Sequence, residues 1–195
     1  MSPTDLVATL RAAGCVFAED EAALLAREAA DDDALAAMVA RRVAGEPLEQ
    51  VVGFAEFLGL RVAVASGVFV PRLRTTLLAQ RAAQVLRPGD VAVDLCCGTG
   101  AVGMALLAAV PGAEVHAADI DPAAVACARR NLPVDRVHEG DLYDALPGSL
   151  RGRVDVVAAN APYVPTAAIA TMPPEARDHE HRVALDGGPD GLDLL

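Results

Sequence analysis

Residues 91–103 have the sequence V-A-V-D-L-C-C-G-T-G-A-V-G, in which a short apolar run leads into a glycine-rich turn. The apolar run predicts a buried strand, and residues 101–110 predict the helix that follows it. Gly98, Gly100 and Gly103 fit the pattern G-x-G-x-x-G, whose glycines allow a tight turn and a close approach of the backbone to a ligand. This stretch therefore predicts a strand–turn–helix unit that binds a nucleotide-containing cofactor at its turn.

The sequence around this unit alternates between helix and strand patterns. Further helices are expected over residues 75–86 and 122–131, and further strands over residues 114–119, 136–139 and 154–159. Strands separated by helices of this length are typical of a parallel, doubly wound sheet, which binds ligands at the carboxyl ends of its strands. The expected fold class is therefore α/β, with a Rossmann-like, mostly parallel sheet.

The residues before position 75 predict two other units. Residues 1–53 have the pattern of short helices, and their charge runs, such as the one at Arg41-Arg42, are interpreted as solvated helix faces. Residues 54–70 have strand composition with Gly59 and Gly67 as turn candidates, so they predict a β-hairpin that ends at Pro71. We expect a helical domain over residues 1–53, a hairpin linker over 54–72 and a cofactor-binding domain over 73–195.

The composition limits the kind of partner and the compartment. The 195 residues carry a formal net charge of −11, which argues against binding to nucleic-acid phosphates. The four cysteines have no zinc-ligand spacing, so no metal site is predicted, and they are interpreted as small apolar residues in a reducing compartment. The sequence shows neither a signal peptide nor an apolar run of membrane-spanning length, which predicts a soluble, cytoplasmic protein.

Three acids follow the predicted strands and are candidate cofactor ligands. Asp94 precedes the glycines, where a carboxylate would repel a pyrophosphate but can face the cationic amino-acid end of S-adenosylmethionine. Asp119 ends the second strand and can accept both ribose hydroxyls, whereas the competing Asp121, followed by proline, predicts a helix N-cap. Asp141 can accept a hydrogen bond from an adenine amine, with Leu142 lining the adenine pocket, or it is an ordinary loop acid.

The tetrapeptide Asn160-Ala161-Pro162-Tyr163 follows the last predicted strand. An amide or aromatic amine is a poor nucleophile because its lone pair is delocalised. The Asn160 side-chain oxygen and a following backbone carbonyl can accept the N–H groups, so that the lone pair points at a sulfonium methyl, and Tyr163 can stack on the planar group. The rest of the catalysis would be in-line positioning and exclusion of water. Together with the upstream glycines, the tetrapeptide predicts methyl transfer to nitrogen.

These residues resemble a known family. The stretch 94–103, Asp119, Asp141 and the tetrapeptide at 160–163 are similar to the S-adenosylmethionine-dependent class I methyltransferases with an N-P-P-Y-type motif. Residues 45–48 and 53–59, the run G-V-F-V-P-R at 67–72, and residues 174–180 and 184–192 resemble, more specifically, the HemK-type protein-(glutamine-N5) methyltransferases. The run at 184–192 is specific to this subfamily among methyltransferases.

The resemblance implies S-adenosyl-L-methionine as cofactor, a glutamine side-chain amide as methyl acceptor, and a class 1 peptide-chain release factor as protein substrate. It implies that the helices of residues 1–53 help to recognise the release factor. Asn160 and the carbonyl of Ala161 would hold the glutamine amide, with Pro162 beside them and Tyr163 stacked on it. Gly98, Gly100 and Asn160 would also contact the cofactor. Three more residues would lie near the cofactor pocket: Pro71, Arg72 and Thr75. The resemblance further implies a sheet that is incomplete at the C-terminus, because the family continues with further strands.

Two other functions are compatible with the residues. Ala161 stands where the family has the first proline of N-P-P-Y, and the family's P-R-P-E-T-E run is P-R-L-R-T-T here, which favours a cofactor-binding paralogue with a regulatory role. N-P-P-Y motifs also serve amino-methyltransferases that act on nucleic-acid bases, but the acidic charge and the run at 174–192 argue against that substrate. Methylation of a protein glutamine is the first expectation.

Overall fold

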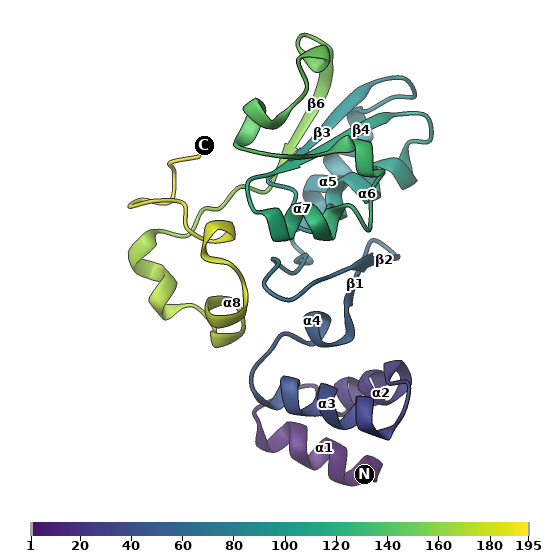
Figure 1. The fold of residues 1–195 in the computed structure, drawn as a ribbon, viewed down its shortest axis with the longest axis vertical. Helices are drawn as coiled ribbons and strands as arrows, with labels where there is room; N and C mark the ends of the chain where they lie inside the picture. The colour runs from purple at the N-terminus through teal and green to yellow at the C-terminus, as the bar shows by residue number, and fades with distance from the viewer. Residues whose placement is uncertain (1, 195) are drawn as a thin grey trace.

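The computed structural model describes residues 2–194, and its N-terminal part is a small group of helices (Figure 1). These helices are α1 (Pro3–Ala12), α2 (Ala18–Glu28), α3 (Asp32–Val43) and the short α4 (Leu48–Val52). Leu6, Leu10 and Leu25 form part of their buried core. The side chains of Ser2 and Asp31 accept N–H groups at the starts of α1 and α3, as is usual for helix N-caps.

A β-hairpin follows the helices, but it is shorter than the sequence predicts. It consists of β1 (Phe54–Phe57) and β2 (Leu60–Ala63), which pair antiparallel. The expectation that residues 64–70 form its continuation is wrong, because β1 begins directly after α4: the N–H of Val64 still donates to the carbonyl of Gly53 at 2.9 Å, and residues 2–53 contain no strand that could pair with the residues beyond it. The side chain of Asn131 binds the edge of β2 that faces away from β1, where its oxygen accepts the N–H of Ala63 at 2.8 Å and its nitrogen donates to the Ala63 carbonyl at 2.9 Å. Gly67 instead forms a parallel bridge with Glu180, more than a hundred residues later in the chain.

The C-terminal two-thirds is built on a four-stranded parallel sheet, which confirms the α/β prediction. Its strands are β3 (Val91–Leu95), β4 (Glu114–Asp119), β5 (Val137–Glu139) and β6 (Val154–Ala159), in the order β5-β4-β3-β6. Because all four strands run in the same direction, their carboxyl ends lie along one edge of the sheet.

Within residues 2–194 the two faces of the sheet are covered differently. The helices α5 (Thr75–Val85), α6 (Ala101–Ala109) and α7 (Pro122–Ala128) pack on the face that carries Ala92, Val115 and Ala117. On the opposite face, Val93 and Leu95 pack against the 3₁₀ turn η2 (Leu142–Ala145) and its neighbours. No helix of the described residues is long and apolar enough to cross a bilayer.

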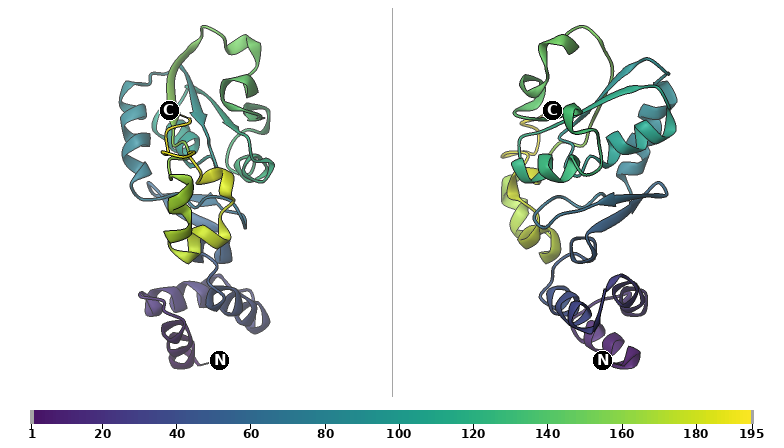
Figure 2. Two further views of the ribbon diagram at one scale, coloured as in Figure 1. Left: turned by 90° about the vertical axis from the view of Figure 1, so that its left-hand side faces the viewer. Right: turned by 45° about the vertical axis from the view of Figure 1, so that its right-hand side comes forward.

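The segment after β6 leaves the sheet and folds back on its own start, where Val164 and Asp186 form a parallel bridge. It contains the 3₁₀ turn η4 (Thr166–Thr171), the helix α8 (Pro174–His179) and the 3₁₀ turn η5 (Arg182–Ala184). Figures 1 and 2 show this yellow-green segment alongside the hairpin and the edge of the sheet. Two further 3₁₀ turns, η1 (Val134–Arg136) and η3 (Gly148–Leu150), lie in the loops before β5 and β6.

Candidate functional site

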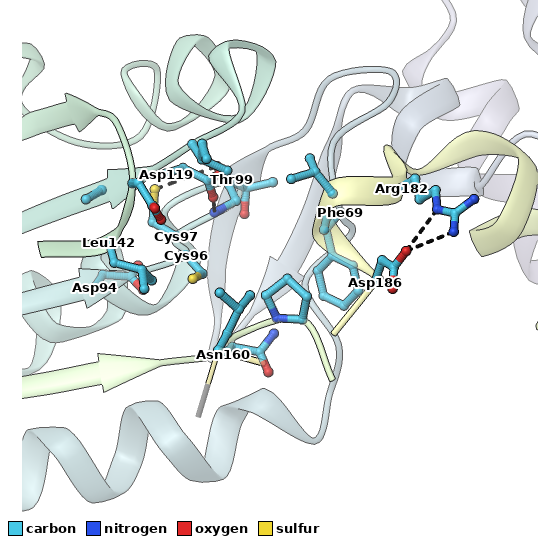
Figure 3. Close-up of a pocket in the computed structure, with 18 of the residues that line it drawn as sticks. Phe69, Asp94, Cys96, Cys97, Thr99, Asp119, Leu142, Asn160, Arg182 and Asp186 are labelled. Carbon is cyan, nitrogen blue, oxygen red and sulfur yellow. Dashed lines mark hydrogen bonds and ion pairs between the residues drawn. The ribbon is translucent and has the colours of Figure 1, made fainter. Parts of the chain in front are cut away.

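A cavity of about 720 Å³ lies at the carboxyl ends of the four parallel strands. Asp94 and Cys96 border it from β3 and its turn, Asp119 from β4, Leu142 from the loop after β5, and Asn160 from the loop after β6 (Figure 3). The volume falls within the range of about 300–1,000 Å³ that is usual for small-molecule pockets. The parallel sheet therefore brings together residues that are far apart in the sequence.

The glycine-rich turn contributes to this cavity through Gly98 but not through Gly100. Gly98 lines the cavity, and its N–H donates to Oδ2 of Asp119 at 2.8 Å. Gly100 does not line it: a Cβ there would lie 2.8 Å from Cδ1 of Leu132, and the backbone φ is +76°. The glycine at position 100, the N-cap of α6, thus allows the turn to pack closely on Leu132. The contact of Gly100 with the cofactor stays a prediction.

Asp94 is the most deeply buried acid of the cavity, with 2% of its surface exposed. Its Oδ2 accepts the N–H of Gly103 at 2.8 Å, so one oxygen is fixed toward the first turn of α6. Burial raises the pKa of the Asp94 carboxyl to about 7, despite this hydrogen bond. The site therefore holds an acid whose charge depends on pH near neutrality and which a cationic ligand would favour in its ionised form.

Asp119 and Asp121 are placed differently by the structure. Asp119 lines the cavity, and its Oδ1 accepts the N–H of Asp121 at 3.0 Å. Burial raises the pKa of the Asp119 carboxyl above its usual value. Asp121 accepts the N–H of Ala123 at 2.9 Å, which confirms it as the N-cap of α7. Asp119 thus remains the acid at the end of β4 that faces the cavity.

Two non-glycine residues of the cavity have strained backbones. Cys96 has φ +55° and Leu142 has φ +43°, a region that L-residues with bulky side chains rarely adopt. Both line the cavity, and so does Asp141, which is exposed and forms no capping hydrogen bond. Strained residues of this kind cluster at ligand sites, where the surrounding structure fixes them.

A second, smaller cavity of about 110 Å³ adjoins the first on the other side of the tetrapeptide. Asn160 borders both cavities, Pro162 borders the larger one, and Ala161 and Tyr163 border the smaller one. Within residues 2–194 the side-chain amide of Asn160 has no hydrogen-bond partner, so its oxygen and nitrogen are available to a ligand. Asn160 is thus one of the residues at the boundary between the two cavities, together with Phe69 and Ala184.

Tyr163 lies at the open side of the smaller cavity with 43% of its surface exposed. The guanidinium of Arg74 donates to the Tyr163 hydroxyl, and its Cζ lies 5.4 Å from the ring centroid. Arg74 therefore orients the ring from outside. The sequence motif did not indicate this partner, because Arg74 stands in the run that departs from the family pattern.

The downstream run at residues 184–192 supports the tetrapeptide directly. The N–H of Val164 donates to the carbonyl of Leu185 at 3.0 Å, and the N–H of Gly187 donates back to the carbonyl of Val164 at 2.9 Å. A Cβ at Gly187 would lie 2.8 Å from the carbonyl oxygen of Pro162, so only glycine allows this approach. This contact gives the run at 184–192 a physical role beside the tetrapeptide.

Several lining residues were not predicted from the sequence alone. Phe69 borders both cavities, and Asp186 borders the larger one. Pro71 and Thr75 line the larger cavity and Arg72 the smaller one, near the places that the family resemblance implies. Phe69 and Asp186 lacked a signal because each reaches the cavity only through contacts between segments that are distant in the sequence.

Comparison with known proteins agrees with this geometry. A family model described as a methyltransferase small domain matches residues 60–173. The chain is 43% identical over 164 residues to the release factor glutamine methyltransferase of Streptomyces coelicolor, covering 81% of this chain and 58% of that protein. It is 40% identical over 209 aligned positions to the release factor glutamine methyltransferase of Mycolicibacterium smegmatis, covering 96% and 73%.

Another relative is named for a different methyl acceptor. The chain is 39% identical over 166 residues to the 4-amino-L-phenylalanine/4-methylamino-L-phenylalanine methyltransferase of Streptomyces pristinaespiralis, covering 80% of this chain and 56% of that protein. The chain thus spans a little over half the length of this relative and of the one from Streptomyces coelicolor. By its family model and by its identity to relatives over most of its length, the chain belongs to the family of the release factor glutamine methyltransferases.

Proposed function

We propose that this chain binds S-adenosylmethionine in the larger cavity and transfers its methyl group to the side-chain amide nitrogen of a protein glutamine. The observation that carries the proposal is the position of Asn160, whose unpartnered amide borders both cavities. A residue at this boundary can hold an acceptor nitrogen on one side while the methyl donor lies on the other. The names of the relatives support a release factor as the protein that carries the glutamine.

The residues of the larger cavity fit S-adenosylmethionine chemically. Asp94 is a buried acid without a cationic side chain as partner among residues 2–194, so it suits the positive amino-acid end of the cofactor. Asp119 and Asp141 can accept hydroxyl and amine protons, and Leu142 offers an apolar surface for the adenine. When bound, the cofactor supplies an electrophilic methyl group on a sulfonium.

The residues around the smaller cavity can position a weak nucleophile. The Asn160 side-chain oxygen and the Ala161 carbonyl accept the two N–H protons of the glutamine amide, so that the nitrogen lone pair points into the larger cavity. Tyr163 stacks on the planar amide, and Arg74 keeps the ring in place. Phe69 borders both cavities and limits access of water to the reacting atoms. Orientation of this kind contributes most when both reactants are held near the attacking geometry.

We further propose that the three parts of the chain have separate functions. We infer that residues 1–53 recognise the release factor, that residues 54–72 link this domain to the rest, and that residues 73–195 bind the cofactor. A class 1 release factor is the acceptor that the family resemblance implies. The contacts of the N-terminal helices with α8, which lies downstream of the tetrapeptide, place a separate helical surface near the acceptor side and support a protein acceptor over a free small molecule.

Methyl incorporation from labelled cofactor into a recombinant release factor tests the proposal. We expect label in the release factor with the wild-type chain, and a decrease of about 100-fold with Asn160→Ala, because the acceptor amide loses its orientation. Gln84→Ala is the matched control, since Gln84 is an exposed amide on α5 that borders neither cavity. The cofactor Kd, measured by calorimetry, should stay within a few-fold of the wild type in both variants.

The same assay separates the proposal from its competitors. Free 4-amino-L-phenylalanine as acceptor tests the other acceptor class found among the relatives. Tight cofactor binding without label in either acceptor would contradict methyl transfer and support a binding role. Label with equal yield in Asn160→Ala would contradict the assignment of Asn160.

A further inference from the structure

The segment from Met172 to Ala184 forms part of the wall of both cavities. Met172 borders the smaller cavity, Arg182 and Val183 border the larger one, and Ala184 borders both. The helix α8 lies between these lining residues and contributes none itself. The position of α8 therefore sets where the wall residues on either side of it lie.

α8 is fixed by the N-terminal helices. Nη1 of Arg42, on α3, donates to Oε1 of Glu175 at 2.7 Å, and Nε2 of Gln50, on α4, donates to the carbonyl of His179 at 3.0 Å. These contacts join the first turn and the last residue of α8 to the helical part. Arg42 is 9% exposed, so its guanidinium is held in place when it reaches Glu175.

The direction of Arg42 is set by a second acid. Its Nε and Nη2 donate to the two carboxylate oxygens of Glu21 on α2, at 2.6 and 3.2 Å, and its Nη1 also donates to the carbonyl of Glu46. A bidentate pair of this kind fixes the plane of the guanidinium. The sequence interpretation of Arg41-Arg42 as a solvated face is therefore wrong for Arg42, because its partners lie on other helices.

Gln50 also fixes the segment that carries Phe69. Its Nε2 donates to the carbonyl of Val68 at 3.0 Å, and its Oε1 accepts the N–H of Gly67 at 3.3 Å. Gln50 is 3% exposed, and one side chain thus joins the segment after the hairpin to the end of α8.

The two segments that Gln50 joins also contact each other closely. The N–H of His181 donates to the carbonyl of Gly67 at 2.8 Å, and a Cβ at Gly67 would lie 2.4 Å from Nε2 of His181. Glu180 accepts the N–H of Val70 at 3.0 Å and the guanidinium of Arg72 at 2.5 Å. The wall of both cavities is therefore one hydrogen-bonded unit with an anchor in the helical part.

We propose that Arg42 and Gln50 are positioning residues for the two cavities, through which the N-terminal helices set the place of Phe69 and of the segment from Met172 to Ala184. Neither residue borders a cavity, so neither touches cofactor or acceptor. The inference rests on the proposed function in one respect, namely that the smaller cavity is the side on which the methyl acceptor binds. Loss of the anchor should loosen the wall without unfolding the sheet.

Two variants remove the anchor at either end of α8. Glu175→Ala removes the ion pair between α3 and α8, and it leaves Arg42 paired with Glu21 inside the helical part. Gln50→Ala removes the contacts with Gly67, Val68 and His179. Asp178→Ala is the matched control, because Asp178 is an exposed acid on α8 whose ion-pair partner within residues 2–194 is its neighbour Arg177.

Amide hydrogen exchange tests the proposal without any turnover. We expect exchange at His181 and Val70 to become about tenfold faster in Glu175→Ala and Gln50→Ala, with no change at Val93 in the core of the sheet. Asp178→Ala should match the wild type. Unchanged exchange at His181 and Val70, or equal acceleration that includes Val93, overturns the proposal.

Kinetics with the labelled cofactor and the release factor provide the second readout. At a temperature well below unfolding, we expect kcat/KM for the acceptor to fall at least about fivefold in Glu175→Ala and to stay unchanged in Asp178→Ala. A merely structural ion pair would lower the Tm and leave kcat/KM unchanged, which would overturn the proposal. If even the wild type fails to methylate the release factor, the proposed function fails, and hydrogen exchange still decides the role of Arg42 and Gln50.

Discussion

At the scale of single residues, Asp94 connects the glycine-rich turn to the cavity. Its carboxylate is 2% exposed and accepts one N–H from Gly103, and no side-chain cation of residues 2–194 pairs with it. A buried acid in this position is poorly solvated when ionised, which is why its pKa rises to about 7. A cationic ligand would supply the charge that the fold itself does not.

The affinity for S-adenosylmethionine should therefore depend on pH through Asp94. Below about pH 7 the carboxyl is protonated and no longer attracts the positive amino-acid end, so the affinity should fall by up to about tenfold per pH unit. Calorimetric titrations between pH 5.5 and 8.5 measure this, with Asp94→Asn as the variant that removes the titration. Equal affinity of the wild type across this range would contradict the role of Asp94.

The same residue should reduce the stability of the fold without ligand. Because the pKa of Asp94 is about 7 in the folded chain and has its ordinary value of 3.8 in the unfolded chain, the folded chain binds the proton more tightly, and stability falls as pH rises between these values. Asp94→Asn should therefore raise the free energy of unfolding at pH 8 by about 1–3 kcal/mol and have little effect at pH 4. Urea denaturation at the two pH values tests this, and a destabilised variant at pH 8 would contradict it.

Residue roles that depend on local geometry could be predicted from the sequence. Asp121 followed by Pro122 indicates the N-cap of α7, and the structure confirms it. Gly100 shows the limit of this approach, because a glycine pattern does not tell ligand contact from close packing, here against Leu132. Phe69 could not be predicted, since its place depends on Glu180 and His181 far along the chain.

At the scale of elements, β4 and β5 are joined by a pair of histidines as well as by their backbones. Nδ1 of His116 lies 3.0 Å from Nε2 of His138, and the rings stack with centroids 5.3 Å apart. Nε2 of His116 lies 2.9 Å from Oε1 of Glu114, and the other oxygen of this carboxylate, Oε2, pairs with Arg153. If both stacked imidazoles took up a second proton, each would carry a positive charge and the two rings would repel each other.

The histidine pair should make the sheet sensitive to acid. Burial, and then the charge of His116, lower the pKa of His138 below its usual 6.5. A lowered pKa means that the unfolded chain binds the proton better, so stability is present above pH 6.5 and is lost as pH falls toward the lowered value. This loss of stability should appear as a decrease of the urea denaturation midpoint between pH 7 and pH 5, and the decrease should be smaller in His138→Gln. The nearby Arg129, Asp135, Glu114 and Arg153 remain in both proteins as the common background. An unchanged pH slope in the variant would contradict the effect.

Element boundaries were predicted well where local signals set them and poorly where distant contacts do. The starts of α1 and α3 lie next to Ser2 and Asp31, whose side chains cap them locally, in the part of the chain that the sequence predicts to be helical. The hairpin ends earlier than its composition suggests because β1 begins directly after α4, and residues 67–70 bond instead to Gln50 and Glu180. A sequence pattern cannot indicate which distant side chain takes the hydrogen bonds of a strand end.

At the scale of the whole molecule, Arg42 joins three parts of the chain. It pairs with Glu21 inside the helical part and with Glu175 on α8, and it is nearly inaccessible to solvent. The sequence places Arg42 in a charged run at a helix end, which usually faces water. Only the folded chain shows that its partners lie at positions 21 and 175.

Replacing Arg42 alone should destabilise the whole molecule more than replacing both Arg42 and its buried partner Glu21 by apolar residues. Arg42→Ala leaves the carboxylate of Glu21 buried without its partner, at a cost of about 3–5 kcal/mol. The double variant Arg42→Met with Glu21→Leu replaces both charges by apolar side chains and should lose less. Urea denaturation of the three proteins measures the difference. A double variant that is less stable than Arg42→Ala would contradict this account of the junction.

The central claim is that Asn160 orients a glutamine amide at the boundary between the two cavities. Peptide mass spectrometry of the release factor, after reaction with wild-type chain or with Asn160→Ala, tests it most directly. We predict a single methyl group on the side-chain amide of one glutamine with the wild type, and about 100-fold less of it with Asn160→Ala at equal cofactor occupancy. A methyl group on another residue type, or equal yields from the two proteins, would contradict the claim.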